Sequence, residues 1–341
     1  MTKSTDKPVV VIPNLNGGED LLLAIGSLQK QTLKPHIIVV DNASTDGSVG
    51  KALKEYPNIE LIQHTKNKGY TGGVNPGLKR AIELGASYAA PFNDDAVADT
   101  EWLEKLVTFL NERPNYGAAC CKVLKSDKKT LDSTGDYVTV WGLPYPRGRD
   151  EKDSGQYDAK TDIFAASGAA SLFRIEALKR VGLFDEDYFA YYEDVDLGFR
   201  LQLAGWKIGF VPTAKVYHKV GMTSGRIKGF TTTQTLKNIQ LLIWKNVPTR
   251  YLFSISLRYT LAEILFFGRA ITRGQLIPAA KGLLLGRLLL LKKIPERRWI
   301  KAHRKVSPDY IWGILVHDLP PNARALRTLR RYWWRLVGKS E

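Results

Sequence analysis

Three carboxylates lie close together at Glu193, Asp194 and Asp196. Apolar residues at helical spacing follow them as far as Gly205, a residue suited to a helix end, so the acids are predicted to open a helix. At about 100° per residue, Glu193 and Asp196 share a face and Asp194 points away, so one carboxylate can face a cleft while the others brace the turn. Acids also favour the positive end of a helix dipole without any catalytic role, and on this stretch alone both interpretations stay open.

A second acidic group, Asn93-Asp94-Asp95, follows the predicted strand at 88–92. Two adjacent carboxylates at a strand end can hold Mg²⁺ or Mn²⁺ against a diphosphate, because these ions bind a few oxygen ligands and leave positions for phosphate. An Asx-type turn is the alternative. His218 ends another strand-like segment, from which it can complete a metal site, although a lone histidine is more often structural.

The elements that must position these groups begin with two apolar, β-branched runs at 8–13 and 36–41, each followed by a predicted helix. Two βα units in succession predict an α/β fold with a doubly wound sheet. Ligands of such sheets bind beyond the carboxyl ends of the strands, where Asn14, Asn16 and Asp41 fall. The Asp41 carboxylate can accept from a ribose hydroxyl or cap the next helix, and both roles stay open.

A glycine-rich segment, 67–77, follows a third predicted strand at 59–62 and is predicted to be a loop that lets the backbone approach a ligand closely. Lys68 offers a charge for phosphate. The chain has no G-x-G-x-x-G after its first strand and no G-x-x-x-x-G-K-[ST], which disfavours a dinucleotide fold and a P-loop. Helix 78–84 is predicted to follow.

Further along, a strand is predicted at 117–123 and a long polar loop at 125–162 that can close over substrate. The small residues of 167–174 let the backbone line a pocket. Cys120 and Cys121 are adjacent, where a disulfide would be strained, and 1–7 lacks the apolar core of a signal peptide. We therefore expect a reduced, cytosolic protein.

Positive charge is concentrated in the last third of the chain. The formal net charge of the whole chain is +16. Residues 221–341 contain 23 Lys and Arg and 5 Asp and Glu, a net charge of +18. Residues 1–220 contain 27 Lys and Arg and 29 Asp and Glu, a net charge of −2. We predict a catalytic domain at 1–225 and a basic amphipathic helical region at 226–341. Such asymmetry indicates an anionic partner surface, either membrane or nucleic acid.

The apolar segments 251–269 and 279–294 carry charges, and no apolar run reaches the roughly 20 residues of a bilayer span. The last predicted helix has an apolar stripe opposite a row of arginines, the pattern of a helix in a membrane interface. The stripe is Leu326, Leu329, Trp333 and Leu336, and the row is Arg324, Arg327, Arg331 and Arg335. The alternative is that these helices pack on the catalytic domain with a solvated basic face.

Together these motifs resemble the inverting family 2 glycosyltransferases of GT-A fold, particularly bacterial rhamnosyltransferase-like members. The resemblance covers about 8–225, roughly two-thirds of the chain. Its motifs are 9–16, 40–46, 67–75, 93–95, 168–174 and 193–196. It implies an α/β, Rossmann-like mixed sheet flanked by helices, followed by the basic helical region.

The resemblance also implies roles for single residues. Asp194 matches the general base of the family. Asp95 matches the last acid of the family's D-x-D element, which is its more reliable metal ligand. The first acid of that element is replaced here by Asn93. His218 stands where several members supply a further ligand to Mg²⁺ or Mn²⁺, and the predicted metal set is Asp95, His218 and Asn93. The donor-binding set is Pro13, Asn14, Asn16, Asp41, Asn67, Lys68, Gly73 and Asp94, and the acceptor set is Gly168, Ala169 and Glu193.

The sequence therefore predicts a metal-dependent inverting glycosyltransferase that builds a cell-surface polysaccharide. Its partners would be a nucleotide-diphosphate sugar, with dTDP-rhamnose favoured, a lipid-linked or polysaccharide acceptor, and the anionic inner face of the cell membrane. A sugar-phosphate nucleotidylyltransferase is an alternative, but 14–19 lacks the basic, glycine-rich pyrophosphate turn. A nucleic-acid-binding protein is another, but the charge accompanies leucine-rich helices without a known binding motif.

Overall fold

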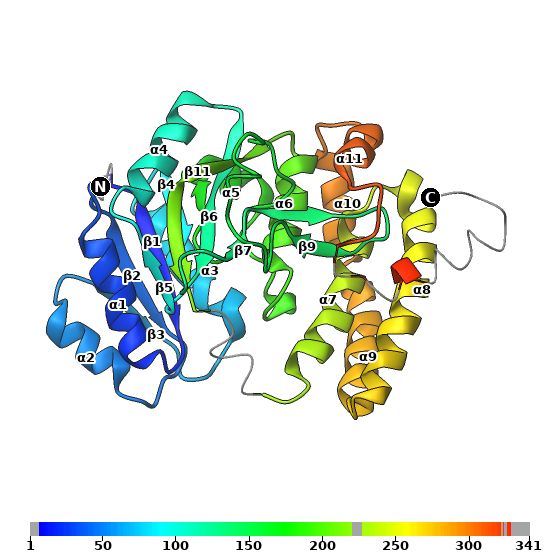
Figure 1. Ribbon diagram of the computed structural model, residues 1–341, viewed down its shortest axis with the longest axis horizontal. Helices are drawn as coiled ribbons and strands as arrows, with labels where there is room; N and C mark the ends of the chain where they lie inside the picture. The colour runs from blue at the N-terminus through cyan, green and yellow to red at the C-terminus, as the bar shows by residue number, and fades with distance from the viewer. Residues whose placement is uncertain (1–6, 220–226, 322, 324–325, 329–341) are drawn as a thin grey trace. The chain divides into compact units, whose positions relative to one another are not determined.

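The structure, a computed structural model, describes residues 7–219, 227–321, 323 and 326–328 (Figure 1). The chain forms two compact units. Unit 1 comprises Met1–Asp136 and Pro146–Lys228, and unit 2 comprises Tyr137–Tyr145 and Gly229–Glu341. Every residue that we predicted to bind donor, acceptor or metal belongs to unit 1.

Unit 1 is built on a mixed nine-stranded sheet in the order β3-β2-β1-β4-β10-β6-β11-β5, with β7 paired to β6. The strands are β1 (Val9–Asn14), β2 (His36–Asp41), β3 (Glu60–Gln63), β4 (Tyr88–Pro91), β5 (Ala96–Ala98), β6 (Tyr116–Lys125), β7 (Leu131–Ser133), β10 (Leu172–Arg174) and β11 (Lys207–His218). The β2 bounds agree with the prediction, and β1 is shifted by one residue.

Helices cover the sheet because its central strands are apolar on both faces. One face packs in a single core with α1 (Gly18–Gln29), α2 (Ser48–Glu55) and α4 (Trp102–Glu112). On the other face, α3 (Gly69–Glu83) lies so close that a Cβ at Gly77 would be 2.3 Å from Val11 Cγ1. The unit is completed by α5 (Ile175–Val181), the 3₁₀ turn η1 (Glu186–Tyr188) and α6 (Glu193–Leu203).

The strand directions bring the candidate residues to one edge of the sheet. β1 runs parallel to β2 and β4, and Asn14 pairs in register with Asp41 at the ends of β1 and β2. β10 is antiparallel to both β4 and β6, and β11 is parallel to β6. The ends of β1, β2, β4 and β11 therefore lie at the same edge as the start of β10.

Two predicted loops are wrong. The glycine-rich segment forms the first turns of α3, because glycine at 73 and 77 lets this helix approach β1 closely. The segment 125–162 carries three short strands, among them β8 (Asp136–Val138) and β9 (Pro144–Pro146), which pair with each other. Backbone hydrogen bonds hold it, such as Leu131 N–H to the Glu151 carbonyl at 2.8 Å. It is an ordered part of the fold.

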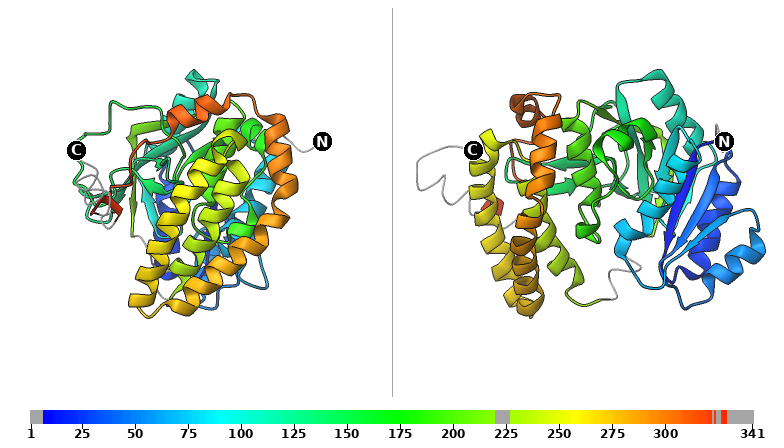
Figure 2. Two further views of the ribbon diagram at one scale, coloured as in Figure 1. Left: turned by 90° about the vertical axis from the view of Figure 1, so that its right-hand side faces the viewer. Right: turned by 180° about the vertical axis from the view of Figure 1, so that it is seen from behind.

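Unit 2 is mainly helical. It contains α7 (Phe230–Asn246), α8 (Thr249–Thr272), α9 (Leu276–Lys292), α10 (Ile294–His303) and α11 (Pro308–Ile314), with α7, α8 and α9 packed side by side (Figure 2). Among the described residues, none of the helices combines the length and the apolar content of a membrane span. The predicted stripe at 326–336 lies mostly outside the described residues.

Candidate active site

Neutral side chains form a hydrogen-bonded network at the ends of β1 and β2. The buried Asn14 amide donates to Ser44 Oγ at 2.9 Å, and its Oδ1 accepts from Gly17 N–H at 3.2 Å. Asn16, in left-handed conformation, accepts from the Thr45 N–H at 2.8 Å. The network fixes the turn after β1, which we predicted to lie against the nucleotide.

Asp41 is buried at the end of β2, and its Oδ1 accepts from the Ser44 N–H at 2.9 Å. This is the local turn that the sequence also allowed. From the described part of the chain, no hydrogen bond reaches its other oxygen, Oδ2. One carboxylate atom thus holds the turn and the other is available to a ligand.

Asn42 joins β2 to the start of α3. Its amide donates to Asn67 Oδ1 at 3.0 Å and to the Gly69 carbonyl at 2.9 Å, and its Oδ1 accepts from the Lys68 N–H at 2.9 Å. A Cβ at Gly73 would lie 3.0 Å from Pro13 Cβ, so the first turns of α3 sit directly against the end of β1. The predicted donor-binding residues of β1, β2 and α3 therefore form one connected group.

Asp94, one of the two acids that follow β4, contacts the turn after β1. Its Oδ2 accepts from the Leu15 N–H at 3.4 Å. Burial, together with the adjacent Asp95, raises the pKa of Asp94 to about 7 against the opposing effect of that hydrogen bond. Burial thus favours the protonated form of the Asp94 carboxyl, and a cation beside it would favour the ionised form.

Asp95 and His218 are brought together as predicted. Asp95 Oδ1 lies 2.9 Å from His218 Nε2, and Asn93 Nδ2 lies 3.1 Å from the same nitrogen. The other ring nitrogen, Nδ1, lies 3.0 Å from Asp132 Oδ2, whose partner oxygen pairs with Arg149 at 3.0 Å. Burial opposes a charge on this ring, but the bonds to Asp132 and Asp95 raise the pKa of His218 to about 9.

These residues fit a divalent cation. A carboxylate from the turn after β4 and an imidazole nitrogen from the end of β11 converge here. A second carboxylate orients the ring from behind, as is common around metal-bound histidines. Asp95 and His218 would hold the ion, with Asn93 beside them. Binding would require loss of the Nε2 proton. A bound cation supplies charge neutralisation for a departing diphosphate.

Asp194 begins the second half of the site, near the N-terminus of α6. Its Oδ2 accepts from the Gly168 N–H at 2.9 Å and its Oδ1 from the Val195 N–H at 2.8 Å. Tyr70 of α3 donates its hydroxyl to the Gly168 carbonyl at 2.5 Å. The backbone at residue 168 is therefore held from both sides.

Gly168 and Ala169 connect the two acidic groups. Gly168 binds the Asp194 carboxylate, and the carbonyl of the next residue, Ala169, accepts from the Asn93 N–H at 2.9 Å. Asn93 is two residues from Asp95. Two consecutive residues thus link the turn after β4 to the start of α6. The turn carries the candidate metal ligand, and the helix start carries the candidate base.

Buried carboxyls surround Asp194. Burial raises the pKa of Asp194, while the N–H groups of Gly168 and Val195 oppose that rise. Burial and the neighbouring Asp194 raise the pKa of Glu193 well above its usual range, and the same two causes act on Asp136. Oε2 of Glu193 accepts no hydrogen bond from the residues that the structure describes. Buried carboxyls with raised pKa values are typical of sites that transfer protons.

The third acid of the motif, Asp196, is structural. It is fully buried and pairs with Arg200 one turn later at 2.9 Å. Arg200 also donates to the Val181 carbonyl at 2.7 Å and so ties α6 to the end of α5. The sequence predicted that some of the three acids would brace the turn, and Asp196 does so.

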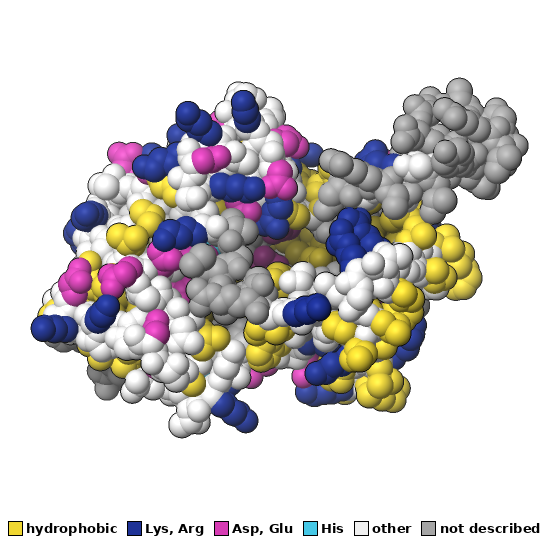
Figure 3. Space-filling model, turned by 60° about the horizontal axis from the view of Figure 1, so that its bottom comes forward, with side chains coloured by type: hydrophobic (Ala, Val, Ile, Leu, Met, Phe, Trp, Pro, Cys, Tyr) yellow, Lys and Arg dark blue, Asp and Glu magenta, His cyan; other side chains and the backbone are white. Residues whose placement is uncertain are grey.

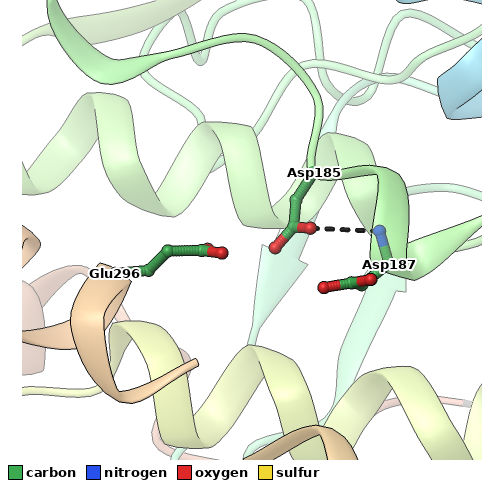
Figure 4. Close-up of side chains that lie close together, drawn as sticks. All are labelled: Asp185, Asp187 and Glu296. Atoms are coloured by element: carbon green, nitrogen blue, oxygen red, sulfur yellow. Dashed lines mark hydrogen bonds between the residues drawn. The ribbon is translucent and has the colours of Figure 1, made fainter. Parts of the chain in front are cut away.

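The chain enters α6 through an irregular segment. η1 is capped by Asp185, whose Oδ1 accepts from the Asp187 N–H at 3.1 Å (Figure 4). After η1, left-handed backbone occurs at Phe189, Tyr191 and Tyr192, with φ of 63°, 73° and 67°. Such conformations cost about 1–3 kcal/mol each in non-glycine residues and are frequent at functional sites. Here the three left-handed residues turn the chain so that α6 starts beside residue 168.

Sequence reasoning missed several residues of this site. Asp132, Arg149 and Asp136 lie in the segment that we predicted to be a loop, and Asp132 is 86 residues away from His218. Tyr70 was hidden within the supposed glycine-rich loop. Isolated acids in a polar stretch give no local signal, so only the long-range pairing of strands and turns shows where they lie.

Comparison with known proteins identifies the family. A family model described as Glycosyl transferase family 2 matches residues 9–182, just over half of the chain. The chain belongs to this family. Among its relatives, the N-acetylglucosaminyl-diphospho-decaprenol L-rhamnosyltransferase of Mycobacterium tuberculosis (strain CDC 1551 / Oshkosh) is 31% identical over 245 residues, covering 65% of this chain and 79% of that protein.

A second relative of this glycosyltransferase is the dTDP-rhamnosyl transferase RfbF of Shigella flexneri, 25% identical over 197 residues, which are 57% of this chain and 63% of that protein. Both relatives are named as rhamnosyltransferases. The resemblance to rhamnosyltransferase-like members of the family is therefore confirmed, and the chain is a sugar-transferring enzyme.

Solved structures show the fold. A mannosyltransferase from Pyrobaculum calidifontis, in complex with GDP-Man and Mn²⁺, matches with a TM-score of 0.52 at 18% identity over 92% of this chain and 88% of that chain. TarS residues 1–349 of S. aureus match with a TM-score of 0.53 at 17% identity, over 90% of this chain and 92% of that chain. The predicted GT-A fold of this transferase, a mixed sheet flanked by helices, is confirmed.

Proposed function

We propose that this enzyme is a metal-dependent inverting glycosyltransferase that moves a sugar from a nucleoside-diphosphate donor to a lipid-linked acceptor during cell-surface glycan synthesis. The observation that carries the proposal is the link from Asp194 through Gly168 and Ala169 to Asn93, beside Asp95. It joins a candidate base to a candidate cation site. Membership of the family favours transfer over the nucleotidylyltransferase and nucleic-acid-binding alternatives.

In the proposed reaction, an acceptor hydroxyl attacks the anomeric carbon in line with the departing diphosphate. Asp194 takes the proton of that hydroxyl, and the raised pKa of its buried carboxylate suits this role. The Gly168 and Val195 N–H groups orient the carboxylate. Asp41 and the Asn14 turn bind the base and ribose, and Lys68 faces the phosphates.

The donor that we favour is dTDP-rhamnose, and the acceptor class is a polyprenyl-diphosphate sugar. These choices follow the names of two relatives, one a dTDP-rhamnosyl transferase and the other a transferase acting on a decaprenol-linked sugar. An acceptor of that kind would place the enzyme at the inner face of the cell membrane. Glu193 and the 168–169 backbone would line the acceptor side.

The test is release of nucleoside diphosphate from a panel of nucleotide sugars, with Mn²⁺, Mg²⁺ or chelator, in the presence of a short-chain polyprenyl-diphosphate N-acetylglucosamine. We expect release from dTDP-rhamnose that requires both the acceptor and the ion. Release of pyrophosphate instead would indicate nucleotidyl transfer. Absence of turnover with every donor would contradict the proposal.

A further inference from the structure

The exposed sides of α8 and α9 in unit 2 are apolar. On α8, Phe253 is 80% exposed, and on α9, Ile277 is 79% exposed. Further exposed apolar residues recur at intervals that keep them on the same side of each helix. They are Leu257, Leu261 and Ile264 on α8 and Leu284, Leu288 and Leu291 on α9. Single exposed leucines are ordinary, but two aligned rows mark an interaction surface.

The opposite sides of both helices are already packed. Leu236 of α7 forms a small core with Ala270 of α8 and Ala279 of α9. α9 approaches α7 so closely that a Cβ at Gly286 would lie 2.6 Å from Gln240 Nε2. The two apolar rows therefore lie on the sides away from this core, and Figure 3 shows hydrophobic side chains gathered with Lys and Arg on the surface of the helical unit.

Basic residues accompany the rows. The stretch 249–292 contains seven Lys and Arg and a single acid, Glu263. That acid is buried and pairs with Arg287 at 3.2 Å, so it does not offset the charge at the surface. Lys281 and Lys292 fall beside Leu288 on the helical wheel of α9. On α8, Arg250 pairs with Asp309 at 2.9 Å, and Arg258, Arg269 and Arg273 project roughly 100° or more from the centre of the apolar row. The charge beside the rows is therefore carried by Lys281 and Lys292 of α9.

We propose that this α8–α9 face, defined by the two apolar rows with Lys281 and Lys292, binds the surface of an anionic lipid bilayer. The rows would enter the boundary between headgroups and acyl chains, and the basic residues would contact headgroup phosphates. The inference is independent of the transferase activity, because it requires neither a sugar donor nor the acids of unit 1.

Other partners fit this face less well. A second copy of the chain would bring the same basic residues against each other, because a twofold interface pairs a patch with itself. A nucleic acid would use the basic residues, but the apolar rows would gain nothing from phosphate contacts. A bilayer with anionic lipid satisfies both the rows and the charges.

The test uses the full-length chain in flotation with vesicles of phosphatidylcholine alone or mixed with phosphatidylglycerol. We compare a double variant, Leu257→Glu with Leu288→Glu, with the control Leu23→Glu. Leu23 on α1 is 55% exposed, the same as Leu257, but belongs to unit 1. We expect wild type and control to float with the anionic vesicles, and the double variant to bind at least about tenfold more weakly.

Charge is tested with Lys281→Glu combined with Lys292→Glu, which we expect to lower binding to anionic vesicles by at least about tenfold, since each basic residue near the surface contributes about a factor of five. Equal binding of both double variants and wild type would overturn the proposal. Light scattering gives the outcome that would assign the face to a second copy. In that outcome, wild type is a dimer that does not bind vesicles, and the leucine double variant is a monomer.

A second readout does not depend on the folding of a charged variant. Leu288→Cys carrying an environment-sensitive fluorophore should shift to the blue with anionic vesicles, whereas Leu23→Cys should not. The native Cys120 and Cys121 are buried and remain unlabelled. An unchanged spectrum at residue 288 would contradict membrane binding by this face.

Discussion

Two regions of the catalytic unit differ in how their polar groups are satisfied. At the ends of β1 and β2, neutral amides and hydroxyls are saturated with short hydrogen bonds, and Asn42 alone makes three of 2.9–3.0 Å. Around Asp194, carboxyls are buried beside one another, and Glu193 has an oxygen without a partner among the described residues. The polar groups of the first region are paired with one another, whereas the second region buries acids at a cost in stability.

We infer that this difference separates binding from chemistry. A preformed hydrogen-bonded frame fixes a ligand with little loss of entropy, which suits the nucleotide. Buried acids with raised pKa values favour their protonated forms, which suits groups that must take a proton. We therefore expect substitutions in the amide frame to affect folding and donor affinity, and substitutions among the acids to affect turnover.

The largest effect is expected from Asp194→Asn. The amide keeps the shape of the carboxylate but cannot take the proton of the acceptor, so kcat should fall by about a thousandfold. Donor affinity, measured by calorimetry, should stay at the wild-type value. Asp127→Asn, an exposed acid on the turn before β7, serves as the control and should keep full activity. Near-normal turnover of the Asp194 variant would remove it from the mechanism.

Asp95→Ala should abolish the increase in donor affinity that a bound cation produces. We expect the affinity for nucleotide sugar in Mn²⁺ to fall by about a hundredfold, to the value that wild type shows in excess chelator. Titration calorimetry with and without the ion measures both. Affinity that is unchanged by the substitution, or wild-type affinity that is insensitive to chelator, would contradict a metal site between Asp95 and His218.

Asn42→Ala tests the amide frame. Removing three hydrogen bonds at a buried position should lower the free energy of unfolding by about 2 kcal/mol in urea titrations. Donor affinity should fall as well, because the Lys68 backbone loses its anchor, whereas kcat at saturating donor should change little. Asn58→Ala, at an exposed position, is the control. A variant with normal stability and lost kcat would reverse the assignment of the two regions.

Glu193→Gln should stabilise the enzyme in a pH-dependent way. Burial beside Asp194 raises the folded-state pKa of Glu193. As the pH rises, the unfolded state therefore loses this proton at a lower pH than the folded state does. At a pH below the unfolded-state pKa, Glu and Gln should be equivalent. As the pH rises from the unfolded-state pKa to the folded-state pKa, wild type loses stability and the variant does not.

We expect the Glu193→Gln variant to be more stable than wild type by about 1 kcal/mol near pH 8 and equally stable near pH 4. Urea titrations at both values measure the difference, with the exposed Glu176→Gln as control. If the variant were destabilised at the higher pH, the Glu193 carboxylate would be making a favourable contact there.

Much of the frame could be predicted from local patterns. The apolar run of β2 and the acids that open α6 are strong signals over a few residues, and both agree with the structure. Asn14 and Asp41 were expected at one sheet edge because parallel strands end together, and they pair in register. A metal-site role for His218 was suggested by its place at a strand end, and the resemblance added its pairing with Asp95.

The rest depended on distant contacts. Glycine at 73 and 77 indicates a loop by composition, but it is required there by the close packing of α3 on β1, which sequence spacing does not reveal. Asp132 and Asp136 lie in a polar segment that is ordered by backbone pairing, such as that of Asp136 with Ala165, which no local pattern announces. The exposed rows of α8 and α9 needed coordinates to show which apolar side of each helix is left uncovered.

The central claim is that Asp95 and Asp194 serve one reaction centre, joined through Gly168 and Ala169. A crystal structure of the enzyme with Mn²⁺ and a non-hydrolysable nucleotide sugar tests it most directly. We predict an anomalous manganese signal between the diphosphate and the Asp95 and His218 side chains, with the anomeric carbon facing the Asp194 carboxylate. A manganese ion bound elsewhere, or a sugar directed away from Asp194, would contradict the account.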